Sequence, residues 1–194
     1  MDAEPLLIYI TKFISLTDEE ESILISRLNF RKYLKGQYIV QHGDVCRFSS
    51  FLTSGCTKTF YIDHDGQEHI MMFSIKDWWS SDLGSFISQL PANYNVQCIE
   101  PTEAIQISYE NQQKLYDEIP KLDRLFRKIL ERALVASQNR LVRNLSLTAK
   151  ERYLFFKEQY PSFEQRIPQY MIASYLGITK EFLSKIKSQI ILDQ

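Results

Sequence analysis

The side chains best suited to binding chemistry lie in the segment 169–188. Polar and basic residues recur there at helical spacing, while Leu183 and Ile186 stand three residues apart, on the other side of the same helix. Lysine, glutamate and serine can bond base edges and phosphates. The residues expected to contact DNA are Gln169, Thr179, Lys180, Glu181, Ser184, Lys185 and Lys187. The same pattern also fits two packed surface helices whose lysines are only solvated.

A helix-turn-helix is the element that would position this polar face. Ile172 and Leu176 are four residues apart, and Ala173 beside them allows two helices to approach closely. Gly177 permits a tight turn, and the Thr179 hydroxyl can cap the second helix. The segment therefore predicts two short helices, with the polar face on the second.

The charge distribution along the chain agrees with this expectation. The chain has 194 residues and a net charge of -1. Residues 1–120 contain 9 Lys and Arg against 17 Asp and Glu, a net -8, whereas residues 121–194 contain 14 against 7, a net +7. This asymmetry favours an acidic body joined to an end that binds a polyanion, although a basic helix paired with its own acidic domain would give the same split.

Neither a membrane nor an oxidising compartment is indicated by the sequence. We read no signal peptide in the acidic start, and no apolar run is long enough to cross a bilayer. Cys46, Cys56 and Cys98 are widely spaced and odd in number, so we expect small buried residues and no zinc or redox site. The sequence thus predicts a cytoplasmic protein.

Short strands are predicted in the first half of the chain. Glycines separate stretches rich in β-branched and aromatic residues, which is typical of a sandwich, roll or small barrel. The expected strands are 38–40, 50–52, 57–62, 69–73, 96–99 and 104–107, with a hairpin turn at 63–66 and a first helix at 16–28.

After Ser108 the apolar period changes to that of helices, predicted at 110–119, 120–145 and 148–160. One apolar stripe of the long helix consists of Leu122, Phe126, Ile129, Ala133 and Ala136. Spacings of four and three residues keep this stripe on one side. It could pack within its own chain or form the seam of a dimer.

Three short motifs, in this order, carry a resemblance to a known family. Residues 35–44, 51–58 and 65–68 resemble the early β-roll signature, the next strand pair and the hairpin of the Crp/Fnr superfamily of bacterial transcription regulators. The segment 148–188 resembles especially the short-tailed members common in Bacteroidetes-type bacteria. Only six residues follow Ser188, too few for a two-stranded wing.

The resemblance implies an α+β fold with three parts. These are a cyclic-nucleotide-binding-like β-roll or jelly roll over 1–119, a long dimerisation helix over 120–146, and a (winged) helix-turn-helix over 147–194. It further implies a homodimer on a palindromic operator, with RNA polymerase as a possible further partner. Lys180, Glu181 and Lys185 match the positions with which the family reads bases. Gln169 and the remaining polar residues suit phosphate contacts.

The effector pocket that the resemblance implies has altered residues. The positions of the family's Gly-Glu and Arg-Ser pairs fall on Ser81-Asp82 and near Ala92-Asn93, so the phosphate loses its arginine partner. We therefore expect no response to cyclic AMP. The pocket residues are Ser81, Asp82, Leu83, Ala92, Asn93 and Tyr94. The roll would sense an unknown small molecule or only support the dimer.

Enzyme, metal and cofactor chemistry find little support in the sequence. No nucleophile and base share a recognisable local signature, and no cysteine cluster could hold an iron–sulfur centre. We expect no catalytic residue, no cofactor and no metal. Two alternatives stay open: a small-molecule-sensing β-roll whose last helices contact protein, and a cupin-like metalloenzyme. The three scattered histidines His42, His64 and His69 weigh against the second, because a cupin clusters its histidine and glutamate ligands.

Overall fold

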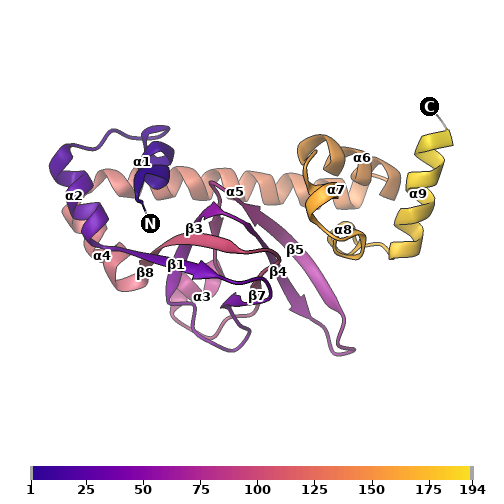
Figure 1. Cartoon of the computed structure of the whole chain (residues 1–194), viewed down its shortest axis with the longest axis horizontal. Coiled ribbons are helices and arrows are strands. Elements are labelled where there is room, and N and C mark those ends of the chain that lie inside the picture. The colour runs from indigo at the N-terminus through magenta and orange to yellow at the C-terminus, as the bar shows by residue number, and fades with distance from the viewer. Residues whose placement is uncertain (1, 193–194) are drawn as a thin grey trace. The chain divides into compact units, whose positions relative to one another are not determined.

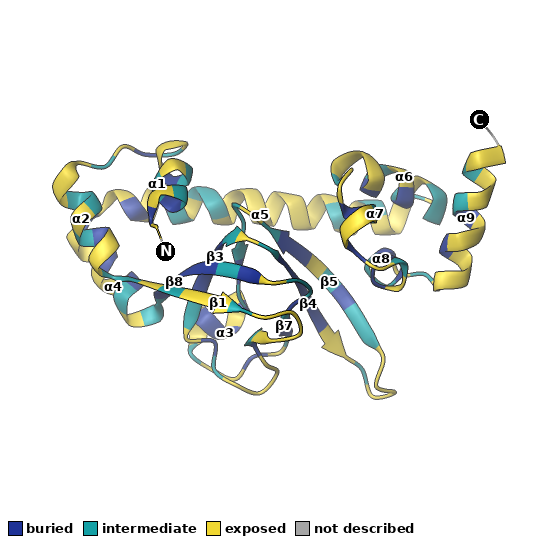
Figure 2. Ribbon diagram, viewed as in Figure 1, coloured by how far each residue is buried: buried dark blue, intermediate teal, exposed yellow. Residues whose placement is uncertain are grey.

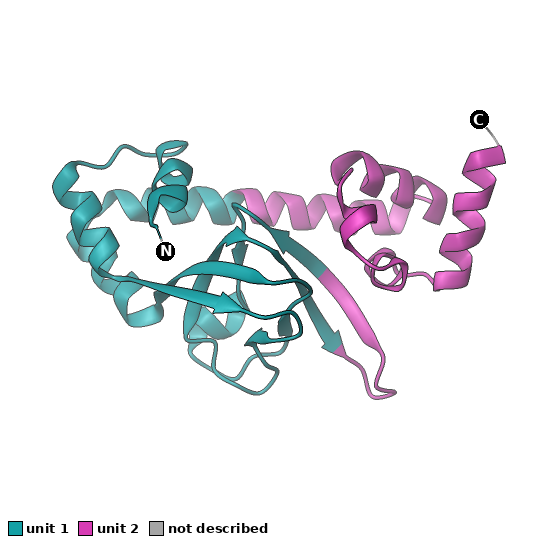
Figure 3. Cartoon of the chain, in the orientation of Figure 1, with its two compact units in different colours: residues 1–61, 72–131 teal, residues 62–71, 132–194 magenta. Residues whose placement is uncertain are grey.

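The structure, a computed structural model, describes residues 2–192 and divides into two compact units. The first contains residues 1–61 and 72–131, and the second contains residues 62–71 and 132–194 (Figure 3). The division differs from the three predicted domains, because it falls inside the long helix and assigns a hairpin from the β domain to the second unit.

Two antiparallel four-stranded sheets form the β-sandwich of an α+β fold, as predicted (Figure 1). One sheet has the order β1-β8-β3-β6, with bounds Leu28–Tyr33, Thr102–Ser108, Phe48–Ser54 and Trp79–Ser80. The other has the order β2-β7-β4-β5, with bounds Tyr38–Val40, Asn95–Cys98, Cys56–Ile62 and Glu68–Ile75. Every strand predicted from the sequence is present.

Helices pack against the first sheet and complete the larger core. They are α1 (Glu4–Thr11), α2 (Asp18–Ser26), α4 (Tyr109–Glu118) and the first half of α5 (Lys121–Ser146). Phe51 of β3 pairs in register with Ile105 of β8, and both lie buried with Leu6, Leu115 and Leu122. A smaller cluster around Val40, Cys46, Phe86, Ala92 and Val96 involves α3 (Leu83–Ser88).

A glycine is required where β3 turns into β4. Gly55 has a φ of +91°, and a Cβ at this position would collide with Thr102 and with the carbonyl of Pro101. Only glycine adopts this conformation without strain and leaves room for that neighbour.

The helices of the second unit share a separate core. They are α6 (Ala149–Gln159), α7 (Phe163–Arg166), α8 (Gln169–Leu176), α9 (Lys180–Leu192) and the second half of α5. A capping box begins α6, in which Thr148 and Glu151 exchange hydrogen bonds. Aromatic and aliphatic side chains fill the interior: Tyr153, Phe156, Phe163, Ile167, Ile172, Leu176, Leu183 and Ile186.

Five elements were not expected from the sequence, and the first predicted helix ends at another residue. The new elements are α1, β1, β6, α3 and α7. The helix predicted at 16–28 ends at Ser26, because Leu28 begins strand β1 and pairs with Ile107. The capping box of this helix, between Thr17 and Glu20, is present. None of the described helices is both long and apolar enough to cross a membrane.

Candidate nucleic-acid interface

The two predicted short helices are present as α8 and α9, joined by a tight turn. Gly177 ends α8 in the left-handed conformation, with a φ of 68°. The Thr179 hydroxyl then accepts a hydrogen bond from the Phe182 N–H at 3.1 Å, which caps the start of α9 as expected. The turn therefore has the chemistry that the sequence predicts.

Apolar side chains hold these two helices in place. Ile172, Ala173 and Leu176 of α8 are buried, and Leu183 and Ile186 of α9 are buried as well. The remaining side of α9 is open to solvent, as the yellow ribbon in Figure 2 shows. The packing thus fixes which side of α9 can meet a partner.

The exposed side of α9 carries most of the residues predicted to contact DNA. Lys180, Glu181, Ser184 and Lys185 are all exposed. No described residue forms an ion pair with either lysine, so both charges remain available to a ligand. Thr179 is exposed beside them in the turn, while Gln169 lies half-buried at the start of α8.

Lys187 differs from the other predicted contacts because it has an internal partner. Its ammonium lies 2.9 Å from Glu164 Oε1, which also accepts a 2.5 Å hydrogen bond from the Tyr153 hydroxyl. Burial opposes ionisation of Glu164, yet the hydrogen bonds from Tyr153 and Lys187 outweigh it and hold the pKa of this carboxyl below its usual value. Lys187 is thus partly neutralised within the fold.

The altered effector-pocket positions surround one buried carboxylate. Asp82 is 2% exposed, and its Oδ1 accepts the Ser85 N–H at 3.0 Å at the start of α3. Its Oδ2 accepts the N–H groups of Asn93 at 2.9 Å and Tyr94 at 3.1 Å. Three main-chain donors that could otherwise hold an anionic ligand therefore bind a side chain of the protein.

The other predicted pocket residues lie around this carboxylate but differ in exposure. Ala92 is buried, and its main chain bonds Asp44 and Gly43. Ser81 and Tyr94 are half-buried, whereas Leu83 and Asn93 are exposed. The six positions lie in one region of the fold, where Asp82 accepts hydrogen bonds from Asn93 and Tyr94.

The stripe predicted as a dimer seam divides into two parts along α5. Leu122 is buried in the protein's own core, and Phe126 and Ile129 pack against that core. Ala133 and Ala136, further along, are exposed. Larger apolar residues of α5 are exposed too: Leu130, Leu134, Val135, Leu141, Val142 and Leu145. The first part of the stripe therefore packs within the chain's own hydrophobic core.

Contacts that the sequence did not indicate hold α8 to the β5 end of the 62–71 hairpin. The Ser174 hydroxyl donates to the Glu68 carbonyl at 2.8 Å and accepts from the Ile70 N–H at 3.0 Å. Arg140 of α5 donates to the carbonyls of Met71 and Tyr175. Serine and arginine at these positions have no sequence pattern that would mark them, because their partners are distant in the chain.

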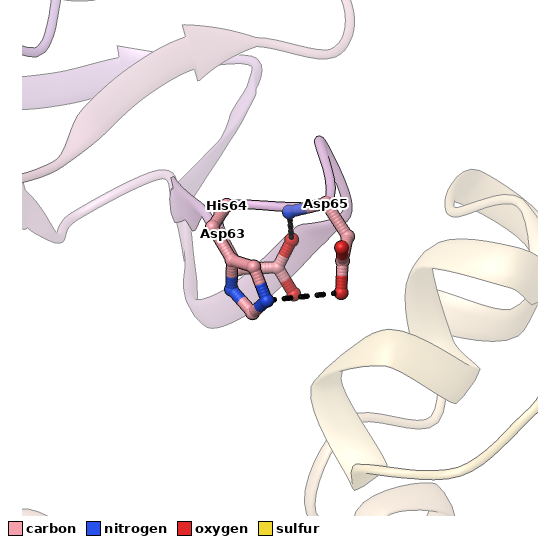
Figure 4. Close-up of side chains that lie close together, drawn as sticks. All are labelled: Asp63, His64 and Asp65. Atoms are coloured by element: carbon pink, nitrogen blue, oxygen red, sulfur yellow. Dashed lines mark hydrogen bonds and ion pairs between the residues drawn. The ribbon is translucent and has the colours of Figure 1, made fainter.

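The turn of that hairpin carries the one group of potential metal ligands found among the described residues. Asp63, His64 and Asp65 offer ligand atoms that lie within 4.8 Å of one another (Figure 4). Asp63 already accepts the N–H groups of Asp65 and Gln67 and bonds His69 Nε2 at 2.6 Å. These bonds, the His69 contact foremost, lower the pKa of Asp63. The carboxylate therefore shapes the turn, as a hairpin signal requires.

Comparisons with known proteins agree with this architecture. The model of the cyclic nucleotide-binding domain matches residues 30–118. The transcriptional activator Anr of Pseudomonas aeruginosa is 24% identical over 167 residues, covering 80% of this chain and 68% of that protein. The transcriptional activator FnrA of Stutzerimonas stutzeri is also 24% identical, with the same coverage.

Two solved structures share the fold over most of their length. FixK2 of Bradyrhizobium japonicum has a TM-score of 0.73 at 16% identity, covering 86% of this chain and 85% of that one. The c-di-GMP-responsive global regulator CLP of Xanthomonas campestris has a TM-score of 0.71 at 15% identity, covering 91% and 93%.

These matches agree with one another on the class of protein. The chain has a cyclic nucleotide-binding-type β domain followed by helices, and its relatives by sequence are transcriptional activators. The matches support the resemblance to the Crp/Fnr superfamily that the sequence motifs indicated.

Proposed function

We propose that this protein is a DNA-binding transcription regulator that reads its site with α9. The observation that supports this most directly is the division of α9 into a buried side, Leu183 and Ile186, and an exposed basic side around Lys180 and Lys185. A helix held on one side and free on the other can enter the major groove.

Individual roles follow from the chemistry of the exposed residues. Lys180 and Lys185 can donate to guanine O6 and N7, and Glu181 can accept from cytosine N4. Thr179, Ser184 and Gln169 suit phosphate contacts, which position the helix without reading sequence. Phe182 is 48% exposed, which leaves its ring free for a thymine methyl group. Because lysine lacks the bidentate fork of arginine, base reading should be less strict.

The protein acts as a homodimer in this proposal, with α5 as the seam. Leu130, Leu134 and Leu141 are separated by four and seven residues, which places them on one side of the helix. All three are exposed in the single chain, Leu134 to 61%. A second copy of α5 would cover them, and two copies of α9 would then address a palindromic operator. Ala133 and Ala136 would allow close approach.

Binding of cyclic AMP is not part of this function. Asp82 places a negative charge among the main-chain donors of Ser85, Asn93 and Tyr94, where a phosphate would be repelled. No arginine stands at the predicted pocket positions to offset that charge. Calorimetry should therefore show no binding of cyclic AMP, and tight binding would contradict this part of the proposal.

Selection of bound genomic DNA at two salt concentrations tests the central claim and supplies the operator. Lys180→Ala and Lys185→Ala should each cost about 1–3 kcal/mol on the selected site and relax its sequence preference. Lys76→Ala is the matched control, since Lys76 is an exposed lysine of the first unit. Wild-type affinity for both α9 variants would show that α9 is not the reading helix.

The alternatives predict different results in the same material. A protein-binding α8–α9 pair predicts DNA association without steep salt dependence. A cupin-like metalloenzyme predicts a stoichiometric metal in the purified protein. His42 does not support that site, because it bonds the Ala92 carbonyl through Nδ1, while His69 pairs with Asp63.

A further inference from the structure

A recessed pocket of the second unit lies between the end of α5, α6 and α8. Its cavity volume is about 30 Å³, and about 380 Å³ of space free of protein atoms lies within the pocket when the part open to solvent is included. Three guanidinium groups and several aromatic rings line it, and none of the lining residues is an aspartate or a glutamate. The lining residues that matter here are Arg140, Arg143, Arg152, Phe155, Tyr160 and Tyr175.

Two of the three arginines are fixed by main-chain carbonyls. Arg152 donates to the Leu147 carbonyl at 2.8 Å and to the Leu176 carbonyl at 3.2 Å. Arg140 donates to Met71 and Tyr175, and its guanidinium lies 4.1 Å from the centre of the Tyr175 ring. Neither forms an ion pair with any carboxylate within residues 2–192, so both positive charges are positioned but not neutralised.

The third arginine keeps its hydrogen-bonding capacity free. Arg143 is half-buried and stacks on the Phe155 ring, 4.1 Å from its centre. It donates no hydrogen bond to another described residue. Stacking holds a guanidinium in one plane while leaving its N–H edge available to a ligand.

A buried donor in the pocket lining also lacks an acceptor. Arg152 Nε is buried and makes no hydrogen bond. Because this Nε–H is shielded from solvent, it adds to the positive potential of the pocket without contacting a ligand directly. A ligand that lies among three guanidinium groups should accept hydrogen bonds and carry negative charge.

We propose that this pocket binds the phosphoryl group of a small phosphate monoester. Phosphate oxygens match the forked donors of arginine, so Arg143 would hold the phosphoryl group, while the fixed charges of Arg140 and Arg152 would attract it. The remainder of the ligand lies toward solvent against the Tyr160 ring. The occupant would contact Leu176, directly before Gly177 and the α8–α9 turn. This site does not depend on the proposed DNA binding, because it can be tested without DNA.

Calorimetry on the full chain tests the proposal with two probes, inorganic phosphate and phenyl phosphate in a chloride buffer. Both should bind, and phenyl phosphate should bind more tightly because its ring adds aromatic contact. Arg143→Met should weaken both by about tenfold or more, since it removes the free donors and one charge. Arg143 makes no hydrogen bond to any residue within 2–192, so this variant should keep the circular dichroism spectrum of the wild type.

Arg124→Met is the matched control, because Arg124 is an exposed arginine of the same helix outside the pocket. It should bind both probes like the wild type. The proposal is overturned if neither probe binds at about 10 mM, a concentration at which even weak sites fill. Equal binding by Arg143→Met would overturn it as well. If Arg143→Met lost duplex DNA binding but bound both probes like the wild type, the pocket would hold a DNA backbone phosphate, and the proposal of a small phosphate monoester would be overturned.

Discussion

Replacement of Asp82 by alanine should destabilise the first unit without touching its apolar core. The substitution removes the acceptor of three main-chain N–H groups, those of Ser85, Asn93 and Tyr94. Ser85 is buried, so its N–H finds no replacement, whereas Asn93 is exposed and its N–H can bond water. Relief of the buried charge offsets part of the loss.

The expected loss is about 2–4 kcal/mol of unfolding free energy, from roughly 1–3 kcal/mol for each donor left buried, less that offset. For a chain of this size it lowers Tm by about 4–16 °C. Asp82→Asn should also lower the free energy of unfolding, because the amide N–H₂ group would face main-chain N–H donors. Asp44→Ala, at an exposed aspartate of the same unit, should change stability by less than about 0.5 kcal/mol.

Guanidinium denaturation followed by tryptophan fluorescence measures this effect directly. Both tryptophans, Trp78 and Trp79, lie in the first unit and report its unfolding. If Asp82→Ala unfolds at the same midpoint as Asp44→Ala, the three hydrogen bonds do not stabilise the fold. Asp82 then does not take the place of an anionic ligand.

Three further outcomes follow from other parts of the structure. Because the folded-state pKa of Glu164 lies below its usual value, its stabilising effect should be present at neutral pH and fade as pH falls through that pKa. The stability gap between wild type and Glu164→Gln should thus close in acid, and a constant gap would exclude this linkage. All three cysteines are buried, and burial raises the pKa of the Cys46 and Cys98 thiols. A thiol reagent at neutral pH should therefore label none of the three before unfolding. Rapid labelling of native protein would contradict their burial. Leu134→Glu should yield monomers in light scattering, whereas Ile8→Glu, an exposed apolar control on α1, should not; a dimeric Leu134→Glu variant would move the seam elsewhere.

Local patterns made most of the helices and strands predictable from the sequence. Thr17 and Thr148 each precede a glutamate by three residues, and both capping boxes are present. The continuous apolar run at Leu6–Ile10 has no period of its own, so helix α1 was missed. Strand β1 was missed because its residues carry few apolar side chains, and its place is fixed by pairing with β8.

The site was predictable only where its signal is local. The exposed side of α9 follows from the spacing of Leu183 and Ile186, which the structure confirms as buried. The partner of Lys187 is Glu164, 23 residues away, and no spacing rule links them. The arginine pocket likewise joins Arg140 to Arg152 across a helix boundary, a proximity that only the tertiary packing produces.

The second unit contains two separate stretches of the chain, the hairpin 62–71 and the segment 132–194 (Figure 3). The strand end of the hairpin supplies the partners of Ser174 and Arg140, although residues 72–131 separate it from the rest of that unit. The unit is therefore discontinuous, and no single cut can excise it intact. A fragment beginning at Arg132 would lack those partners, so exchange of the last helices between relatives would have to include the hairpin as well.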